Sequence, residues 1–323
     1  MAPSDKNEIY LSSSPHISHK ATTPAIMLCV IIALLPVCVS GVVLYGISAL
    51  ITILVSVVSC VGFEFIFRKL THQKNRCGDL SAVVTGLLLA LVMPPEVPVW
   101  MIILGAFFAI VVAKEFFGGL GANVFNPALT GRAFLFVSFP AAMAKWHRTA
   151  FTSLDALSSA TPLINGMKGF SYLDMFLGNR TGCIGESSIA LILLAFIFLL
   201  VTKVIDWRAP VAMIVTAVLY EWAFTGSYGL FSGDPLFALM SGGLCFGAVF
   251  MTTDYATSPV TAKGRLLFGF GCGLITALIR HFSGYPEGVM FSILIMNTIV
   301  SFLNKLTQRK YGYTSNKKGA ATK

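Results

Sequence analysis

Charged residues are scarce in this sequence. Asp, Glu, Lys and Arg make up 11% of its 323 residues, whereas about a quarter is usual for a soluble domain. Hydrophobic residues account for 56%, so the chain has too few polar side chains to cover a globule of its size. This composition excludes an ordinary soluble enzyme and favours a protein whose solvent is lipid.

Acidic residues are fewer than basic ones, with 14 Asp and Glu against 23 Lys and Arg, and the net charge is +9. In a soluble protein this excess can indicate nucleic-acid binding. Here the basic residues lie between apolar runs rather than in one patch, so we interpret them as signals of membrane orientation and expect no nucleic-acid partner.

Several local patterns of cofactor or targeting segments are also missing. The seven cysteines form no C-x-x-C pair and mostly lie inside apolar runs, which argues against an iron–sulfur or zinc centre made by this chain alone. The first 23 residues lack the short apolar stretch of a cleavable signal peptide. The Gly-rich string at 118–127 follows no predicted strand, which argues against a dinucleotide-binding fold as well.

Long apolar runs, by contrast, are abundant. A membrane-spanning helix needs about 20 apolar residues, and candidates recur at 25–45, 47–67, 81–94, 98–114, 126–143, 188–202, 209–225, 236–252, 265–281 and 288–304. These runs are too long and too uniform for barrel strands, so helices must satisfy their backbone groups. We predict an all-α polytopic membrane protein of about ten transmembrane helices.

The loops between these runs differ in basic charge, which predicts orientation. If ten helices alternate, 17 basic residues fall on one side: Lys6, Lys20, Arg68, Lys69, Lys74, Arg76, Lys114, Lys203, Arg208, Lys263, Arg265, Lys305, Arg309, Lys310, Lys317, Lys318 and Lys323. The other side has four: Lys145, Arg148, Lys168 and Arg180. We therefore place the chain in the cytoplasmic (inner) membrane with both termini in the cytoplasm.

An even number of helices in two sets of five makes the halves inverted repeats. Gly, Pro and Met recur at similar places when 118–129 is laid beside 283–294, and 81–98 beside 241–259. Such broken helices often surround a ligand or ion site where the halves meet, although a chance match remains an alternative. The predicted divisions are a cytoplasmic segment 1–24, a first repeat 25–143, an extracytoplasmic loop 144–187, a second repeat 188–304 and a basic tail 305–323.

The predicted outer loop contains the string DALSSAT at 155–161. Taken alone, A-T-P is typical of a helix start, with Thr161 as the N-cap before Pro162. The string also resembles the D-x-x-S/T-x-A-T signature of the Rnf complexes and the Na⁺-translocating NADH:quinone reductases. In those families a flavin transferase esterifies the phosphate of FMN onto the threonine.

Further strings in the same order resemble the D subunit of the Rnf ferredoxin:NAD⁺ oxidoreductase. They are SSPH (13–16), DLSAVVTGLLLALVMPPEVPVWM (79–101), AKEFFGGLGANVFNPALTGRAFLFVSFP (113–140), GAVFMTTDYATSPVTAKGRLLFG (247–269) and LIRHFSGYPEGVMFSILIMN (278–297). The resemblance covers most of the chain. It implies an electron-transfer subunit of an ion-translocating oxidoreductase, with no complete active site on this chain.

The resemblance also implies cofactors and partners. By this resemblance, Thr161 would carry covalent FMN, and the transferase would recognise Asp155 and Ser158. Asn123 and Asn126, in the Gly-rich string, would lie beside a noncovalent riboflavin; a polar cap on a broken helix is the alternative for these two residues. The implied partners are the A, B, C, E and G subunits of an Rnf complex, the flavin transferase and membrane lipid, and we expect no metal site here.

Ionisable residues near the membrane core have two interpretations. Glu64, Asp79, Glu115 and Arg132 fall within or at the ends of apolar runs, where a charge is costly unless it is paired. They form either an ion pathway or structural ion pairs, and we expect Lys114 to extend toward the membrane surface. The turn at 252–254 either caps helix ends or binds flavin carbonyls.

Ten helices in an inverted repeat also describe urea- and ammonium-type channels and secondary transporters. A channel of that kind needs no flavin attachment sequence. The two functions are therefore distinguished by whether Thr161 carries flavin.

The charge asymmetry makes a topological prediction. Single cysteines placed within 145–180 should react with an impermeant thiol reagent added to intact cells, whereas those within 68–78 should react only after the membrane is opened. Equal labelling of both loops in intact cells would contradict the ten-helix orientation.

Overall fold

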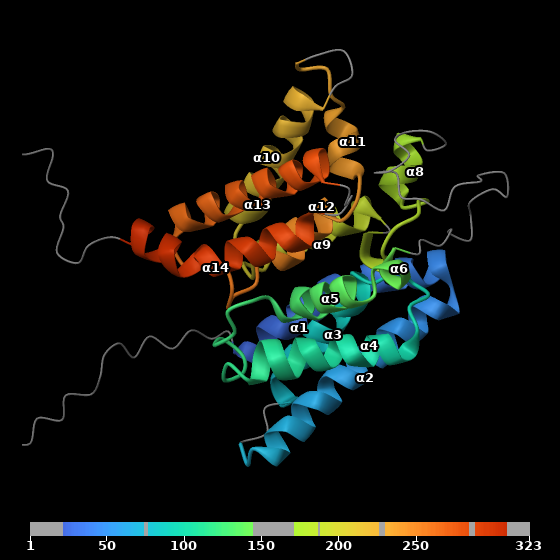
Figure 1. The fold of residues 1–323 in the computed structure, drawn as a ribbon, viewed down its shortest axis with the longest axis vertical. Coiled ribbons are helices and arrows are strands. Elements are labelled where there is room, and N and C mark those ends of the chain that lie inside the picture. Colours follow the sequence, from blue (N-terminus) through green and yellow to red (C-terminus); the bar gives the residue numbers. More distant parts are fainter. Residues whose placement is uncertain are drawn as a thin grey trace, which may run out of the picture.

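The structure is a computed structural model that describes residues 22–73, 77–144, 171–186, 188–225, 230–283 and 288–308. Within these ranges the chain is helical and has no β-strand, which confirms the predicted all-α class. Figure 1 shows two groups of helices, with α1 to α6 on one side of the molecule and α8 to α14 on the other.

The first group follows the predicted apolar runs closely. It contains α1 (Thr23–Tyr45), α2 (Ile47–Leu70), α3 (Ser81–Leu91), α4 (Val99–Phe107), a π-helix that continues α4 (η2, Phe108–Glu115), α5 (Pro127–Ser138) and α6 (Pro140–Met143). A 3₁₀ turn (η1, Cys77–Asp79) precedes α3. Gly46, at φ 75°, separates α1 from α2, because only glycine adopts such an angle without strain.

The second group has more interruptions. It contains α8 (Tyr172–Leu177), α9 (Ile189–Val201), α10 (Arg208–Phe224), α11 (Pro235–Met240), α12 (Leu244–Phe246), a π-helix that continues α12 (η4, Gly247–Met251), α13 (Ala262–Phe282) and α14 (Val289–Thr307). A 3₁₀ turn (η3, Ile184–Glu186) precedes α9.

Each of the ten predicted segments contains helix, but two of them are broken. Segment 126–143 divides into α5 and α6 because Phe139 leaves the helical conformation before Pro140, and proline starts helices but does not continue them. Segment 236–252 divides at 241–243, where Gly242 has φ 60°. That all ten cross the membrane as two inverted repeats stays a prediction.

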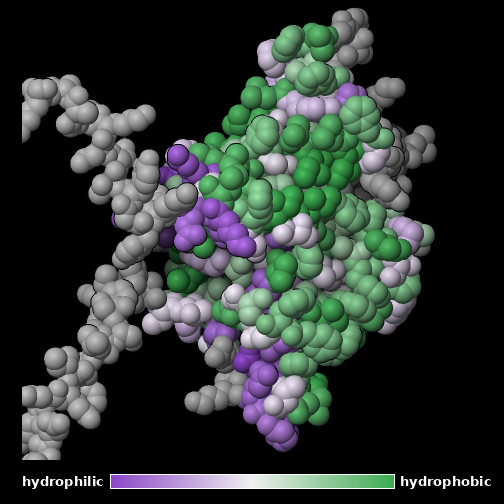
Figure 2. All heavy atoms as spheres, turned by 60° about the vertical axis from the view of Figure 1, so that its left-hand side comes forward, coloured by the Kyte–Doolittle hydropathy of each residue, from purple (hydrophilic) through white to green (hydrophobic). Residues whose placement is uncertain are grey.

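The surface is that of a membrane protein. Among the described residues, four helices are long and apolar enough to span a bilayer: Thr23–Tyr45, Ile47–Leu70, Ala262–Phe282 and Val289–Thr307. Large apolar side chains lie exposed on them, among them Val39, Val58 and Phe282. Figure 2 shows broad hydrophobic areas with hydrophilic residues gathered in separate patches. Lipid contact explains this surface, since water would penalise it.

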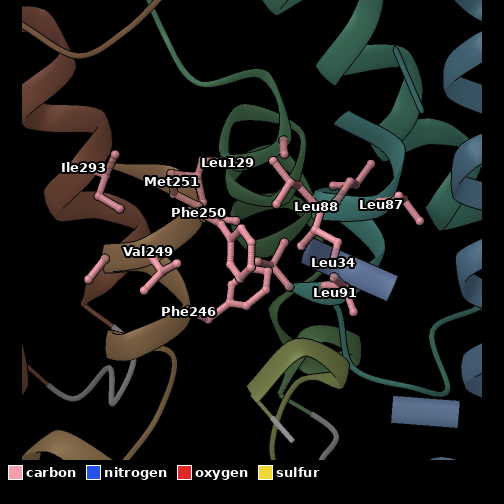
Figure 3. Packing of buried hydrophobic residues seen from close by; sticks show 14 of the residues in the cluster. Leu34, Leu87, Leu88, Leu91, Leu129, Phe246, Val249, Phe250, Met251 and Ile293 are labelled. Atoms are coloured by element: carbon pink, nitrogen blue, oxygen red, sulfur yellow. The ribbon is translucent and has the colours of Figure 1, made fainter. Parts of the chain in front are cut away.

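The two groups share one hydrophobic core. Within the groups, α2 packs on α3 and α4, and α13 packs on α10 and α14; between them, α1 contacts α9 and α5 contacts α14. Figure 3 shows Leu34, Leu88 and Leu91 of the first group facing Phe246 and Phe250 of the second. These side chains form an apolar layer at the junction of the two groups.

Candidate functional site at the junction of the two helix groups

A cavity lies between the two groups, beside this apolar layer. It encloses about 750 Å³ when its open mouth is counted. The first group lines it with Met27, Val30, Ser81, Val84, Thr85, Leu88, Lys114, Leu120, Asn123, Asn126, Pro127 and Ala128, and the second with Leu199, Val204, Ile205, Phe250, Thr253, Asp254 and Tyr255. The structure thus brings both predicted asparagines to one cavity, where the halves meet.

The Gly-rich turn positions the asparagines. Gly118, Gly119 and Gly121 have φ of 112°, 88° and 91°, and these angles let the chain reverse sharply between η2 and α5. Asn126 then caps α5, since its Oδ1 accepts a hydrogen bond from the N–H of Leu129 at 3.3 Å. The helix-cap interpretation is therefore confirmed for Asn126.

The two amides nevertheless keep polar atoms for a ligand. Asn123 donates from Nδ2 to the carbonyl of Phe125 at 3.1 Å, and both asparagines are more than nine-tenths buried. Within the described residues, Oδ1 of Asn123 and Nδ2 of Asn126 have no hydrogen-bond partner. The cavity therefore offers one acceptor and one donor beside apolar walls, which suits the edge of a heterocycle.

Lys114 brings a positive charge to the same cavity. Only 1% of the residue is exposed, and its Nζ lies 3.1 Å from Oε2 of Glu64 and donates to Oγ of Ser81 at 2.7 Å. The prediction that this lysine extends to the membrane surface is wrong. The carboxylate of Glu64 on α2 balances the charge of Lys114, and the hydroxyl of Ser81 at the start of α3 accepts a further hydrogen bond from it.

The ion pair of Lys114 belongs to a larger buried network. Arg68 lies 3.5 Å from Glu64, one turn away on α2, and 3.1 Å from Glu115 on η2. All four charged side chains are at most 4% exposed. Two cations and two carboxylates make the group neutral, as a group in a low-dielectric interior must be. The structural interpretation of Glu64 and Glu115 as ion pairs is thus confirmed.

Asp79 extends this network at the start of α3. Its carboxylate accepts hydrogen bonds from the N–H of Ser81 at 2.9 Å and from its hydroxyl at 2.6 Å. Ser81 in turn accepts from Lys114. The carboxylate of Asp79 is therefore linked to Lys114 through a single hydroxyl group.

The turn at 252–254 closes the cavity from the second group. The hydroxyls of Thr252 and Thr253 donate to the carbonyls of Ala248 and Val249, both at 2.7 Å, so these groups satisfy the end of η4. Asp254 lines the cavity, and burial raises its pKa above the ordinary value although Thr257 donates to it. Of the three turn residues, Asp254 has the side chain best placed for a ligand.

Asn297, in α14, joins the two groups at this point. With its amide oriented to satisfy every neighbour, it donates to the carbonyls of Ile293 and Thr257 and accepts from the N–H of Asn126. This residue is not among those predicted from the sequence. An asparagine in the middle of an apolar run was the available signal, because a buried amide requires partners.

A second polar cluster lies beyond the apolar layer. Arg132 donates to Sγ of Cys183 at 3.3 Å, and Arg280 pairs with Glu221 at 2.9 Å. Arg180, predicted as a cation of the outer loop, is 2% exposed and donates to the carbonyl of Glu186 at 2.8 Å. Arg180 is therefore a structural residue that is not available to the loop surface.

The predicted attachment residue Thr161, together with Asp155 and Ser158, lies outside the described residues. Its role stays a prediction from the sequence. In the part of the chain that the structure describes, no three His, Cys, Asp or Glu side chains gather as a metal site.

Comparisons with known proteins agree on one family over nearly the whole chain. The sequence model of the NQR2, RnfD, RnfE family matches residues 10–312. The D subunit of the proton-translocating ferredoxin:NAD(+) oxidoreductase complex of Clostridium ljungdahlii is 44% identical over 316 residues, which cover 94% of this chain and 96% of the relative.

Two further relatives extend this similarity. The D subunit of the Na(+)-translocating ferredoxin:NAD(+) oxidoreductase complex of Acetobacterium woodii is 43% identical over 97% of this chain and 99% of its own length. The D subunit of the ion-translocating oxidoreductase complex of Methanosarcina acetivorans is 34% identical over 93% of this chain and 96% of its own length.

The buried network predicts the effect of removing one charge. Lys114→Met should lower the free energy of unfolding by about 3 to 5 kcal/mol, because it leaves Glu64 in the interior without its ammonium partner. Unfolding of the purified protein in mixed micelles with increasing sodium dodecyl sulfate would measure this loss.

Lys69→Met is the matched control. Lys69 is exposed and follows Arg68 at the end of α2, so its substitution should change the free energy of unfolding by less than about 0.5 kcal/mol. Adding Glu64→Gln to Lys114→Met should restore part of the stability by removing the uncompensated charge. Equal losses for Lys114→Met and Lys69→Met would contradict the network.

Proposed function

This chain belongs to the NQR2, RnfD, RnfE family, and we propose that it is the D-type membrane subunit of an ion-translocating ferredoxin:NAD⁺ oxidoreductase that carries electrons on flavin. The observation that carries this proposal is the 44% identity to a relative named as the D subunit of such a complex, which extends over 94% of the chain. The similarity includes both helix groups and the loop between them, so it concerns the whole subunit rather than a shared membrane segment.

Covalent FMN on Thr161 is the first flavin of the proposal. Its support is the DALSSAT string at 155–161 in a loop that the charge asymmetry assigns to the outer side. The hydroxyl of Thr161 is the acceptor oxygen, and a transferase supplies the base and the phosphate because an unassisted threonine is a poor nucleophile. Asp155 and Ser158 serve recognition by that enzyme.

Riboflavin in the cavity between the helix groups is the second flavin. The lining residues fit an isoalloxazine ring: Val84, Leu88 and Phe250 offer apolar contact for its faces, while Asn123 and Asn126 offer amide atoms for its polar edge. Bound flavin accepts and donates electrons one or two at a time.

The chain's own residues adapt this cavity to electron transfer. Lys114 and Asp254 line opposite sides of the cavity, so a cation and a carboxylate both act on a bound ring, although the ammonium of Lys114 is already paired with Glu64. The asparagine amides fix the orientation of a bound ring, and the apolar walls exclude water, which strengthens both effects.

The arrangement in the membrane completes the proposal. Ten helices in two inverted repeats, with Thr161 outside and the Asn123 cavity toward the cytoplasm, allow electrons to cross between the two faces. The partners are the A, B, C, E and G subunits of the complex. The relatives with 44% and 43% identity are named for protons and for Na⁺ respectively, so similarity of this degree accompanies either ion.

A flavin-free channel or transporter is the alternative that the proposal must exclude. Such a protein would use the junction cavity for a solute and would leave Thr161 unmodified. Flavin fluorescence that stays with the denatured subunit on a gel is the observation that separates the two functions.

Thr161→Ala should abolish this covalent fluorescence and leave assembly of the complex nearly unchanged, because a loop hydroxyl contributes at most about 1 kcal/mol as a helix cap. Thr161→Ser should keep reduced modification, since it retains the oxygen but loses the methyl group that restricts χ1. Mass spectrometry of the tryptic peptide 149–168 should find FMN minus water added at Thr161.

Thr152→Ala is the matched control for this test, because it removes a threonine from the same peptide outside the motif. It should leave the modification intact. An unmodified wild-type peptide from cells with an active flavin transferase would refute the covalent flavin.

Asn123→Leu should lower the amount of riboflavin extracted from the purified complex without changing covalent FMN, because it removes an amide from the cavity wall. Asn126 is tested better by Asn126→Ser, which replaces the whole amide group by a hydroxyl whose oxygen can still cap α5. Unchanged riboflavin in both variants would exclude these residues from a flavin site.

A further inference from the structure

An open pocket adjoins the junction cavity and shares Tyr255 and Val204 with it as lining residues. It measures about 1320 Å³ with its mouth. Its walls come from the end of α9, the start of α10, the 252–260 loop and the start of α13, and they include Lys203, Asp206, Trp207, Arg208, Val260 and Arg265. The proposed electron-transfer function makes no use of this pocket.

The pocket carries excess positive charge. Arg208 and Arg265 both pair with Asp206, at 2.7 and 2.8 Å, and about a third of each guanidinium side chain remains exposed. Lys203 is exposed and forms no ion pair among the described residues. Three cations therefore face one carboxylate, so the pocket has a net charge of about +2 available to an anion.

Asp206 keeps its negative charge in this setting. Burial disfavours the ionised form, but the N–H of Arg208 and the guanidinium of Arg265 donate hydrogen bonds that hold the pKa of Asp206 below its ordinary value. The carboxylate thus orients both arginines and offsets only one of the three positive charges.

Lys203 lies in the turn that ends α9. The N–H of Val204 donates a hydrogen bond to the carbonyl of Leu199, and the N–H of Lys203 donates one to the carbonyl of Leu200, both at 3.0 Å. This is the Schellman arrangement, whose left-handed position glycine usually occupies. Lys203 stands there with φ 55°, so the chain accepts backbone strain at the residue that brings a cation to the pocket.

Exposed apolar side chains lie along α9, whose end forms one wall of this charged pocket. Leu194, Ile197 and Val201 follow one another down α9 with exposures of 57%, 61% and 75%. Trp207 is half exposed, with the Arg208 guanidinium 5.7 Å from its ring centre. An exposed apolar strip that ends at a tryptophan and several cations is typical of the boundary between acyl chains and lipid headgroups.

We propose that this pocket binds the phosphate of an acidic phospholipid, with Lys203, Arg208 and Arg265 around the headgroup and the acyl chains along α9. The charge selects an anion, and the adjoining apolar strip selects one that carries hydrocarbon chains. An acidic segment of another protein would match the charge but would leave the strip on α9 unused. The proposal is independent of any bound flavin.

The test uses the delipidated complex in detergent, titrated with phosphatidylglycerol or with phosphatidylcholine, while native mass spectrometry counts the bound lipids. Wild type should bind one phosphatidylglycerol much more tightly than phosphatidylcholine. Lys203→Gly should weaken phosphatidylglycerol binding about fivefold, the effect of one basic residue near an acidic lipid surface.

Lys203→Gly also separates binding from folding, because glycine suits the left-handed position and should raise thermal stability. Lys203→Arg should preserve the affinity. Lys263→Gln is the matched control, since Lys263 is exposed at the start of α13 but does not line the pocket, and it should leave lipid binding unchanged.

Three results would overturn the proposal. Equal affinity for phosphatidylglycerol and phosphatidylcholine would show that the charge selects no lipid. A loss of phosphatidylglycerol affinity in Lys263→Gln as large as that in Lys203→Gly would show only diffuse electrostatic attraction. Displacement of phosphatidylglycerol by inorganic phosphate at comparable concentration would show that the acyl chains contribute nothing, and the site would then be one for free phosphate.

Discussion

The buried ammonium group of Lys114 sets the conditions for the first helix group. Burying an ammonium group to 1% exposure is costly unless an opposite charge lies close to it, because burial removes most of its hydration. Glu64 provides that charge from α2, and Ser81 provides a hydroxyl from the start of α3. Three segments that are far apart in the sequence are therefore held at one point, and the position of η2 follows from it.

The junction cavity depends on this arrangement. The π-helix that carries Lys114 runs into the Gly-rich turn, and the turn delivers Asn123 and Asn126 to the cavity wall. Asn297 of α14 then links the two helix groups, because its amide accepts a hydrogen bond from the N–H of Asn126 and donates one to the carbonyl of Thr257. The buried charge, the two amides and the contact between the helix groups therefore lie along one continuous stretch of chain, from η2 to the start of α5.

Polar groups lie on both sides of the apolar layer. Leu88 and Phe250 line the junction cavity, whereas Leu91, one turn after Leu88, and Phe246, one turn before Phe250, lie beside Arg132, Glu186 and Arg280. The rings of Phe246 and Phe250 are 5.1 Å apart, so the layer is closely packed. Apolar side chains separate the two polar regions in this structure, and their low polarity opposes the passage of a bare ion.

Features that depend on local composition could be predicted without the structure. The scarcity of charge indicated a membrane protein, the apolar runs located the helices, and the glycines at 118–121 allowed a tight turn, whereas a cap at Asn126 was only one of two interpretations until the structure showed it. The sequence also contained the motifs that identify the family. The tertiary structure decided which distant side chains meet: that Lys114 pairs inward with Glu64, that Arg180 is buried, and that Asn297 reaches Asn126. Hydropathy cannot reveal these contacts, because the cost of a buried charge or amide depends on partners that only the packing of the helices brings near.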